Sequence, residues 1–226
     1  MNRYAIGGPF GLPKTLPLAR GRSRGSGSRL FPHSAHGVTL VEVLAVLAVG
    51  TTALAIAAPG VLQLRAAVAV RSAAGEVATA FVIARAHAIR RGVYVGVRYQ
   101  KNGDRHEWAL YRDGNGNGIR TAEITRGIDR PLGIAYPWQR NDVFPGILTE
   151  TPVPDPSDPR RPLDRLNDPI RFNNSNICSF SPVGESTPGS VFLWDGHDRM
   201  AVVRVYGRSA KIRTLFYRRG EVEWKP

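Results

Sequence analysis

The pattern of apolar and polar residues divides this chain into three parts. Residues 1–37 show no periodicity and are rich in Gly, Pro, Ser and Arg. Residues 38–58 are almost wholly apolar, and at about 1.5 Å per residue they predict a helix of roughly 31 Å, about the thickness of a bilayer core. After Pro59 apolar residues alternate with polar ones. The pattern therefore predicts one membrane helix followed by one polar head.

Residues 59–91 predict a second helical half, which is amphipathic. Its apolar residues recur at spacings of three and four, so they form a stripe on one face of a helix. We expect this stripe to pack against the head. Pro59 itself, followed by Gly60, predicts a kink where the helix leaves the membrane. The stripe consists of Val70, Ala74, Val77, Phe81, Ala84 and Ala88.

In residues 92–226 the period of the pattern changes and β-forming residues dominate. The first strand candidates are 93–99 and 107–111, joined at Asn102-Gly103, a pair typical of tight hairpins. The prolines of residues 131–169 predict a surface loop or a variable insertion. The expected fold class is α+β and pilin-like: a long N-terminal helix packed on a small antiparallel β-sheet head. Further strands are predicted at 170–172, 177–180, 190–194, 200–206 and 211–217.

Charge and cysteine content narrow the classes of protein that fit. The formal net charge is +13, but six basic residues and no acidic residue precede Val38, so +7 remains for the rest of the chain. Basic residues before an apolar span predict a cytoplasmic N-terminus, with the head on the other side of the membrane. Cys178 is the only cysteine. An intrachain disulfide and sites built from paired thiolates are therefore excluded.

The sequence GVTLVEVL at residues 37–44 joins the basic segment to the apolar run. It closely resembles the processing signal of type IV prepilins and type II secretion pseudopilins. The resemblance implies that a prepilin peptidase cuts between Gly37 and Val38 and then methylates the new amino group of Val38. It also implies an assembly role for Glu42 and a helix-kinking role for Pro59. An ordinary secretory signal fits less well, because the apolar run is long and lacks a following A-x-A cleavage site.

Glu42 lies within the apolar run, where an unpaired carboxylate is costly. In a bundle of such helices the amino group of Val38 would be a cation one helical turn away. The amine of a neighbouring subunit could pair with Glu42 and set the axial register between subunits. The alternative is that the Glu42 carboxylate merely reaches the membrane surface and has no part in assembly.

A loop dense in Gly and Asn follows the first hairpin. Asp113, Asn115 and Asn117 have the alternating spacing of the oxygen ligands in a calcium loop. However, the twelfth loop position is Ile124, the nearby acid Glu123 comes one residue early, and no second helix is evident after the loop. A tight turn is therefore favoured over a calcium site, since Gly and Asn adopt positive φ at low cost.

This loop and the series from Phe180 to Arg208 resemble those of the H-type (GspH-like) pseudopilins and the FimT-like minor pilins. The resemblance implies a structural subunit without a cofactor, not an enzyme. It would be a single-pass protein of the bacterial inner membrane, with a periplasmic head, before it enters a filament. Expected partners are the prepilin peptidase, other pilins or pseudopilins, the inner-membrane assembly platform and the lipid bilayer. A minor pseudopilin of a type II secretion system is the first interpretation, and a FimT-like minor pilin of a type IV pilus is the alternative.

Basic residues crowd toward the C-terminus and suggest DNA binding as a further function. The candidate contacts are Arg208, Lys211 and Arg213, because some minor pilins of this kind take part in DNA uptake. DNA-binding members have a Gly-Arg turn followed closely by a second arginine, but here position 210 is Ala. A solvated sheet face is the alternative explanation. The chain offers no convergent catalytic set; Cys178 and the turn at 195–198 (DGHD) are interpreted as structural.

Overall fold

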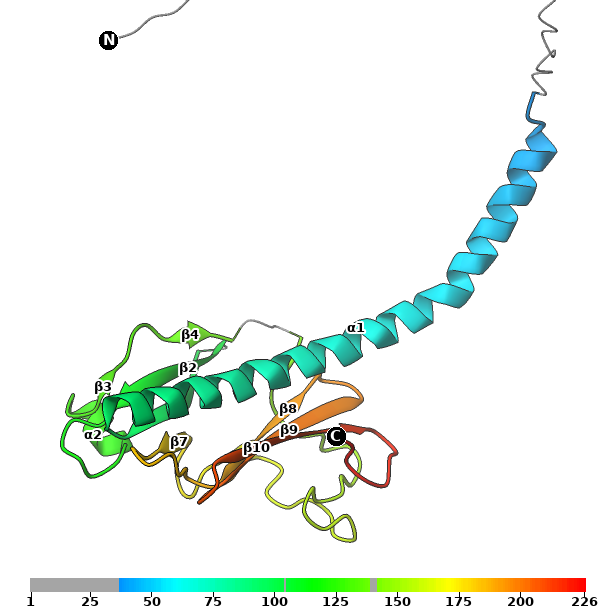
Figure 1. The fold of residues 1–226 in the computed structure, drawn as a ribbon. Helices are drawn as coiled ribbons and strands as arrows, with labels where there is room; N and C mark the ends of the chain where they lie inside the picture. The colour runs from blue at the N-terminus through cyan, green and yellow to red at the C-terminus, as the bar shows by residue number, and fades with distance from the viewer. Residues whose placement is uncertain (1–36, 104, 139–141) are drawn as a thin grey trace, which may run out of the picture. The chain divides into compact units, whose positions relative to one another are not determined.

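The structure is a computed structural model that describes residues 37–226 except residues 104 and 139–141, so residues 1–36 of the predicted leader lie outside the described residues. The chain divides into two compact units, residues 1–47 and 48–226. In the first unit, the described residues 37–47 contain the start of helix α1 (Leu40–Arg91). The second contains the remainder of α1 and the β-rich head (Figure 1).

Helix α1 has 52 residues and begins two residues after the start of the apolar run. Thr39 explains this start, because its Oγ1 accepts the backbone N–H of Glu42 at 3.2 Å and thereby caps the first turn. The helix continues through Pro59 without interruption, and the kink expected there stays a prediction. It ends at Arg91, since Gly92 adopts a φ of +64°, the left-handed conformation that commonly terminates helices.

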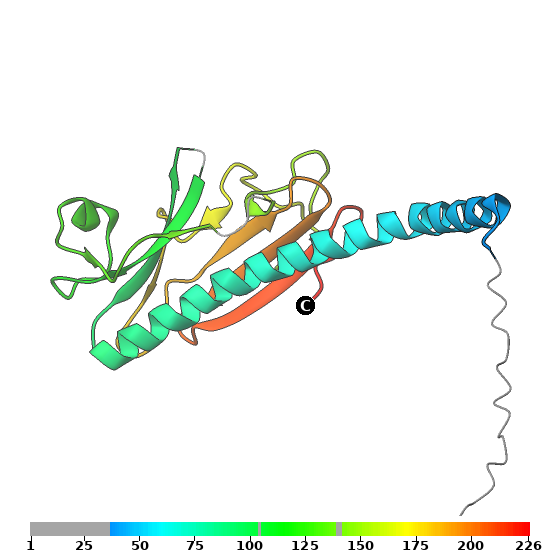
Figure 2. The same cartoon turned by 90° about the horizontal axis from the view of Figure 1, so that it is seen from above.

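The predicted apolar stripe of α1 packs on the head. All six of its residues have relative exposures between 0 and 2% and belong to one core that also contains side chains of both β-sheets. At the centre, the ring of Phe81 lies 6.2 Å from Tyr99, 5.9 Å from Phe172 and 6.2 Å from Phe180. Figure 2 shows this part of α1 lying alongside β9 and β10. The spacing of apolar residues thus predicted the buried face correctly.

The strands form two sheets in which every pair is antiparallel, which confirms the α+β class. The first has the order β3-β2-β1-β7, with β4 also paired to β2, and the second has the order β10-β9-β8-β5, with β6 also paired to β8. The strands are β1 (Val95–Asn102), β2 (Arg105–Arg112), β3 (Arg130–Pro131), β4 (Tyr136–Pro137), β5 (Phe144–Pro145), β6 (Ile170–Arg171), β7 (Ile177–Phe180), β8 (Gly189–Trp194), β9 (Arg199–Tyr206) and β10 (Lys211–Arg218).

The first hairpin is present, but its loop is shifted by one residue from the prediction. Asn102 pairs with Arg105, so Asn102 ends β1 and does not occupy a central turn position. Gly103, with a φ of +60°, takes the first loop position. The ladder between β1 and β2 therefore extends further than the Asn-Gly pair indicated.

Residues 131–169 do more than form a surface loop. Ile147, Leu148, Val153 and Leu163 are buried in a second core against Phe192, Met200 and Val202, on the face of the second sheet that α1 does not cover. The C-terminal segment closes this core, since Trp224 Nε1 donates to the Pro154 carbonyl at 2.7 Å. Prolines exclude a regular central strand but leave the side chains between them free to pack, which explains why composition alone did not indicate this core.

Candidate functional site

The predicted processing site precedes the helix. Gly37 and Val38 are exposed and lie outside α1, so the peptide bond between them is in a non-helical segment. Glu42 lies in the first turn of α1 and is also exposed. A scissile bond ahead of the helix is accessible to a peptidase, and an acidic group near a helix N-terminus is favoured by the helix dipole. The arrangement supports the cleavage, methylation and assembly roles, which stay predictions.

The apolar half of α1 has no protein covering it in the described chain. Its most apolar stretch is 0% buried, and its length and composition are those of a membrane span. The exposed apolar side chains continue past Ala58 to Val61, Leu62 and Leu64. An apolar surface of this extent on one helix is suited to contact with lipid or with other helices.

The head is also attached to α1 by two polar contacts that sequence reasoning missed. Trp108 Nε1 in β2 donates to Glu76 Oε1 at 3.1 Å, and Arg85 Nε donates to the carbonyl of Gly184 at 3.1 Å. Both helix residues flank the apolar stripe. Their partners could not be identified from spacing because they come from distant parts of the chain.

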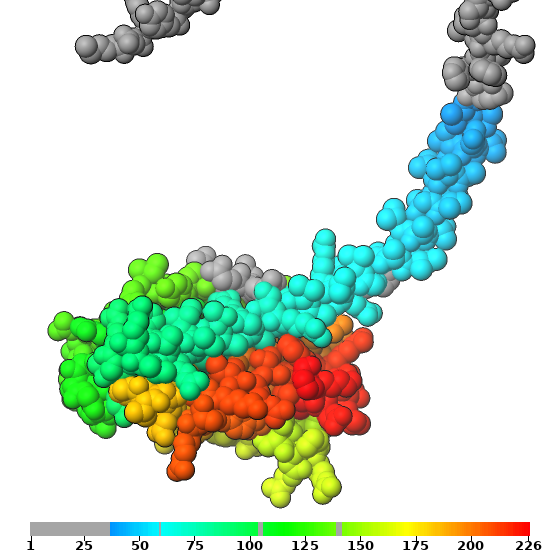
Figure 3. All heavy atoms as spheres, in the orientation of Figure 1, coloured from blue at the N-terminus to red at the C-terminus, as the bar shows by residue number. Residues whose placement is uncertain are grey.

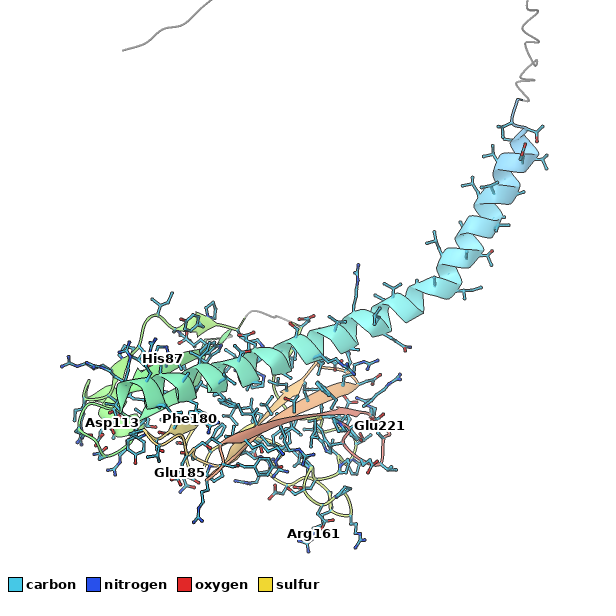
Figure 4. The ribbon with its side chains drawn as sticks, viewed as in Figure 1. His87, Asp113, Arg161, Phe180, Glu185 and Glu221 are labelled. Atoms are coloured by element: carbon cyan, nitrogen blue, oxygen red, sulfur yellow. The ribbon has the colours of Figure 1, made fainter. Side chains whose placement is uncertain are left out.

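The Gly- and Asn-rich loop is organised by two buried carboxylates, those of Asp113, which is labelled in Figure 4, and Asp129. Asp113 Oδ1 accepts the N–H groups of Asn115 at 2.8 Å and Gly116 at 2.7 Å, and its Oδ2 accepts that of Gly118 at 2.6 Å. Burial alone would raise the pKa of Asp113, but these backbone donors outweigh it and lower the pKa below its usual value. Asp129, which sequence reasoning missed, accepts two further N–H groups from the same loop.

The structure corrects one expectation about this loop. A short helix, α2 (Thr121–Thr125), follows it, although no second helix was evident from the sequence. Asn117 Nδ2 donates to Glu123 Oε1 at 2.8 Å, so these two side chains close the loop on each other. Within the described residues no group of three His, Cys, Asp or Glu side chains could hold a metal ion. The hydrogen bonds favour the tight-turn interpretation, and calcium binding stays a prediction.

The register of β9 and β10 places arginines directly opposite each other in two pairs. Arg204 is the partner of Arg213, and Arg199 is the partner of Arg218. Because side chains alternate between the faces of a strand, the first pair lies on the outer face of the sheet and the second lies on the face toward α1. Like charges in this position destabilise a sheet. In the part of the chain that the structure describes, none of these four arginines forms an ion pair with a carboxylate.

The three predicted DNA contacts are exposed, and two of them share one surface. Lys211 and Arg213 lie on the outer face of β10, and Arg208 lies in the turn before it. The structure adds Arg204, whose Nη1 donates to Ser157 Oγ at 2.7 Å. Ala210 is buried and has a φ of +47°, so a charged arginine at this position would have to leave the core that Ala210 contacts.

Comparison with known proteins identifies the head and its anchor. A family model described as "Type II transport protein GspH" matches residues 73–208, which is more than half of the chain. The chain belongs to the GspH family. A second model, the prokaryotic N-terminal methylation motif, matches residues 32–58 and so includes Gly37, Val38 and Glu42. Neither a search of curated proteins nor a search of solved structures found a match.

Membership of the GspH family confirms the resemblance inferred from the sequence. This is a family of structural pseudopilins, and the methylation motif implies processing by a prepilin peptidase and other pilins as partners. The motif and the exposed apolar half of α1 suit a single-pass, membrane-anchored pilin. The motif match contains Gly37, Val38 and Glu42 and ends before Pro59, and the individual roles of these residues stay predictions.

Two other features noted in the sequence, Cys178 and the turn at 195–198, make contacts typical of structural residues in this GspH-family head. Cys178 is buried, which raises the pKa of its thiol well above the usual value, and its Sγ lies 3.9 Å from the Thr187 carbonyl. In the 195–198 turn, Asp195 Oδ1 accepts the N–H groups of His197 and Arg199 at 2.8 and 3.0 Å. These contacts support the structural interpretations of both groups.

Proposed function

We propose that this protein is a minor pseudopilin of a type II secretion system, processed at Gly37 and assembled through α1 into a periplasmic pseudopilus. The observation that carries the proposal is the division of α1. One half is apolar and uncovered, and the other half holds a head of the GspH family through a continuous core. Such a helix suits lipid before assembly and the helices of other subunits afterwards.

In this proposal the N-terminus is cytoplasmic, the head is periplasmic and the work of the protein is assembly, not catalysis. Cleavage would create an amino group at Val38, and the Glu42 carboxylate would pair with that group on a neighbouring subunit. The pair would relieve the cost of two charges in an apolar bundle and fix the axial register of the new subunit. The assembly platform of the inner membrane would then move the subunit into the filament.

Deletion of the gene, with complementation by the wild-type gene, tests the secretion role. We expect the deletion strain to accumulate type II substrates in the periplasm and to keep its type IV pili. Normal secretion with loss of pili would contradict the proposal and favour the FimT-like minor pilin. The two measurements, secreted protein and surface pili, are made in the same strains so that a growth defect affects both equally.

DNA binding is a second candidate function, supported by the outer-face arginine pair. Arg213 is exposed directly opposite the partly exposed Arg204, with Lys211 on the same face and Arg208 in the adjoining turn. The phosphates of a DNA backbone would offset the repulsion between these two arginines, and binding would release counterions from the DNA. Such binding would make the protein a membrane-tethered DNA receptor.

The test is binding of duplex DNA by the mature protein across a salt series. If Lys211 and Arg213 each contact a phosphate, the double variant K211Q/R213Q should reduce the slope of log K against log salt by about 2. The variant R199Q/R218Q removes the same charge from the other face and is the matched control. Equal effects of the two variants, or an affinity no higher than that of an unrelated basic protein, would contradict DNA binding at this surface.

A further inference from the structure

A cavity of about 350 Å³ lies between α1 and the ends of β9 and β10, and the C-terminal segment closes one side of it. Figure 3 shows the C-terminal segment, in red, next to the part of α1 drawn in cyan. The walls are partly apolar, from Val70 and Phe216 among others. The charged lining residues are Arg71, Arg199, Arg218, Lys225 and Glu221.

The charges of this cavity are strongly unbalanced. Glu221 is the single acidic side chain of the lining, and it is already used: its Oε1 lies 2.6 Å from Lys225 Nζ and its Oε2 accepts the Arg218 N–H at 3.1 Å. Arg199 and Arg218 are direct cross-strand partners. Arg71 approaches them from α1, with its guanidinium 5.3 Å from the centre of the Phe216 ring. Three guanidinium groups therefore line a cavity that has one acidic side chain. Glu221 interacts electrostatically with Arg218, whereas Arg71 and Arg199 form no ion pair with a carboxylate among the described residues.

The residues of α1 that line the cavity follow closely after the apolar, membrane-spanning part of this helix. No charged residue occurs between Glu42 and Arg65, and the exposed apolar side chains of α1 run without a charge to Leu64 and include Val68 beyond Arg65. At about 1.5 Å per residue, Ala67 lies roughly 4.5 Å and Arg71 roughly 10.5 Å beyond Leu64. The headgroup layer on one side of a bilayer is about 5–7 Å thick, and the Debye length is about 8 Å. The uncharged stretch from Val43 to Leu64 has 22 residues, roughly 33 Å of helix, so it can span the hydrocarbon core in place of the predicted residues 38–58. With this placement the near end of the cavity is at the depth of lipid headgroups.

We propose that this cavity binds the phosphate group of an anionic phospholipid before the subunit enters the filament. Guanidinium groups are suited to phosphate because their planar array of donors matches two oxygens at once. A phosphate between Arg199 and Arg218 would remove the repulsion of this pair, and the apolar wall formed by Val70 and Phe216 would receive the adjoining glycerol backbone. The proposal rests on membrane anchorage by α1 and does not depend on the choice between secretion system and pilus.

The proposal is tested with the full-length mature protein in a neutral detergent. Phosphatidylglycerol or phosphatidylcholine is added, and retained lipid is counted by native mass spectrometry. We expect a preference for phosphatidylglycerol, and an affinity about 30-fold lower in R199Q/R218Q, since each arginine near an anionic headgroup contributes roughly fivefold. The matched control is R204Q/R213Q, which removes the other arginine pair of the same two strands and should bind like the wild type.

Three results would overturn the proposal. The first is equal retention of the two lipids, and the second is an equal loss of affinity in R199Q/R218Q and R204Q/R213Q. The third is a site that inorganic phosphate or duplex DNA fills without a preference for phosphatidylglycerol. Because R199Q/R218Q removes a like-charge pair, its thermal unfolding should not fall below that of the wild type. The single variant R71Q, from α1, provides a second measurement on the same cavity.

Discussion

Replacement of Phe81 by alanine tests the packing that makes α1 and the head one unit. Phe81 is 0% exposed, and its ring contacts Tyr99 of β1, Phe180 of β7 and Phe172 just after β6. It therefore joins the helix to both sheets. Loss of a buried phenylalanine costs about 3–5 kcal/mol in transfer and cavity terms. Since each aromatic contact adds about 0.5–1.5 kcal/mol, we expect a loss near the upper end of that range, about 5 kcal/mol.

The free energy of unfolding can be measured by urea titration of the mature protein in a neutral detergent, followed by tryptophan fluorescence. All four tryptophans lie in the head, so the signal reports unfolding of the head and not loss of the membrane helix. The control is Val82→Ala, the next residue of α1, which is 57% exposed and should change stability by no more than about 0.5 kcal/mol. A loss below about 1 kcal/mol for Phe81→Ala, or equal losses for both variants, would refute this account of the packing.

Three further predictions concern assembly, pH dependence and thiol reactivity. Glu42→Ala should leave Val38 cleaved and N-methylated by mass spectrometry but reduce incorporation into filaments; normal incorporation would rule out the pairing role. The lowered pKa of Asp113 means that its stabilisation is present above the unfolded-state pKa of about 4 and is lost as pH falls through the folded-state pKa. Asp113→Asn should therefore cost about 1–3 kcal/mol at pH 7 and progressively less as the pH falls below about 4, and a pH-independent cost in urea unfolding would contradict this. Cys178 should resist alkylation in the folded protein and react once urea unfolds the head, because burial raises the pKa of its thiol; equal rates in both states would be inconsistent with its burial.

Most of the architecture could be predicted from the sequence because it depends on local periodicity. The spacing of Val70, Val77 and Phe81 fixed the buried face of α1, and all three are buried. The strand candidates coincide with β1, β2 and β6–β10 apart from their ends. The motif at 37–44 depends on residue identity at fixed offsets, and family comparison confirmed the protein class that it indicated.

The tertiary structure decided what depends on contacts between distant segments. Proline content hid the second core, because Leu148 and Val153 pack only when residues 131–169 fold back over β8 and β9. Asp129 joins the Asp113 loop across the intervening helix α2. The sequence showed a basic C-terminal region, but a change in strand register by one residue would have separated Arg199 from Arg218. Composition therefore determined how much positive charge this head carries, whereas strand pairing determined that four of its arginines form two opposed pairs, one on the face of the sheet away from α1 and one on the face toward α1.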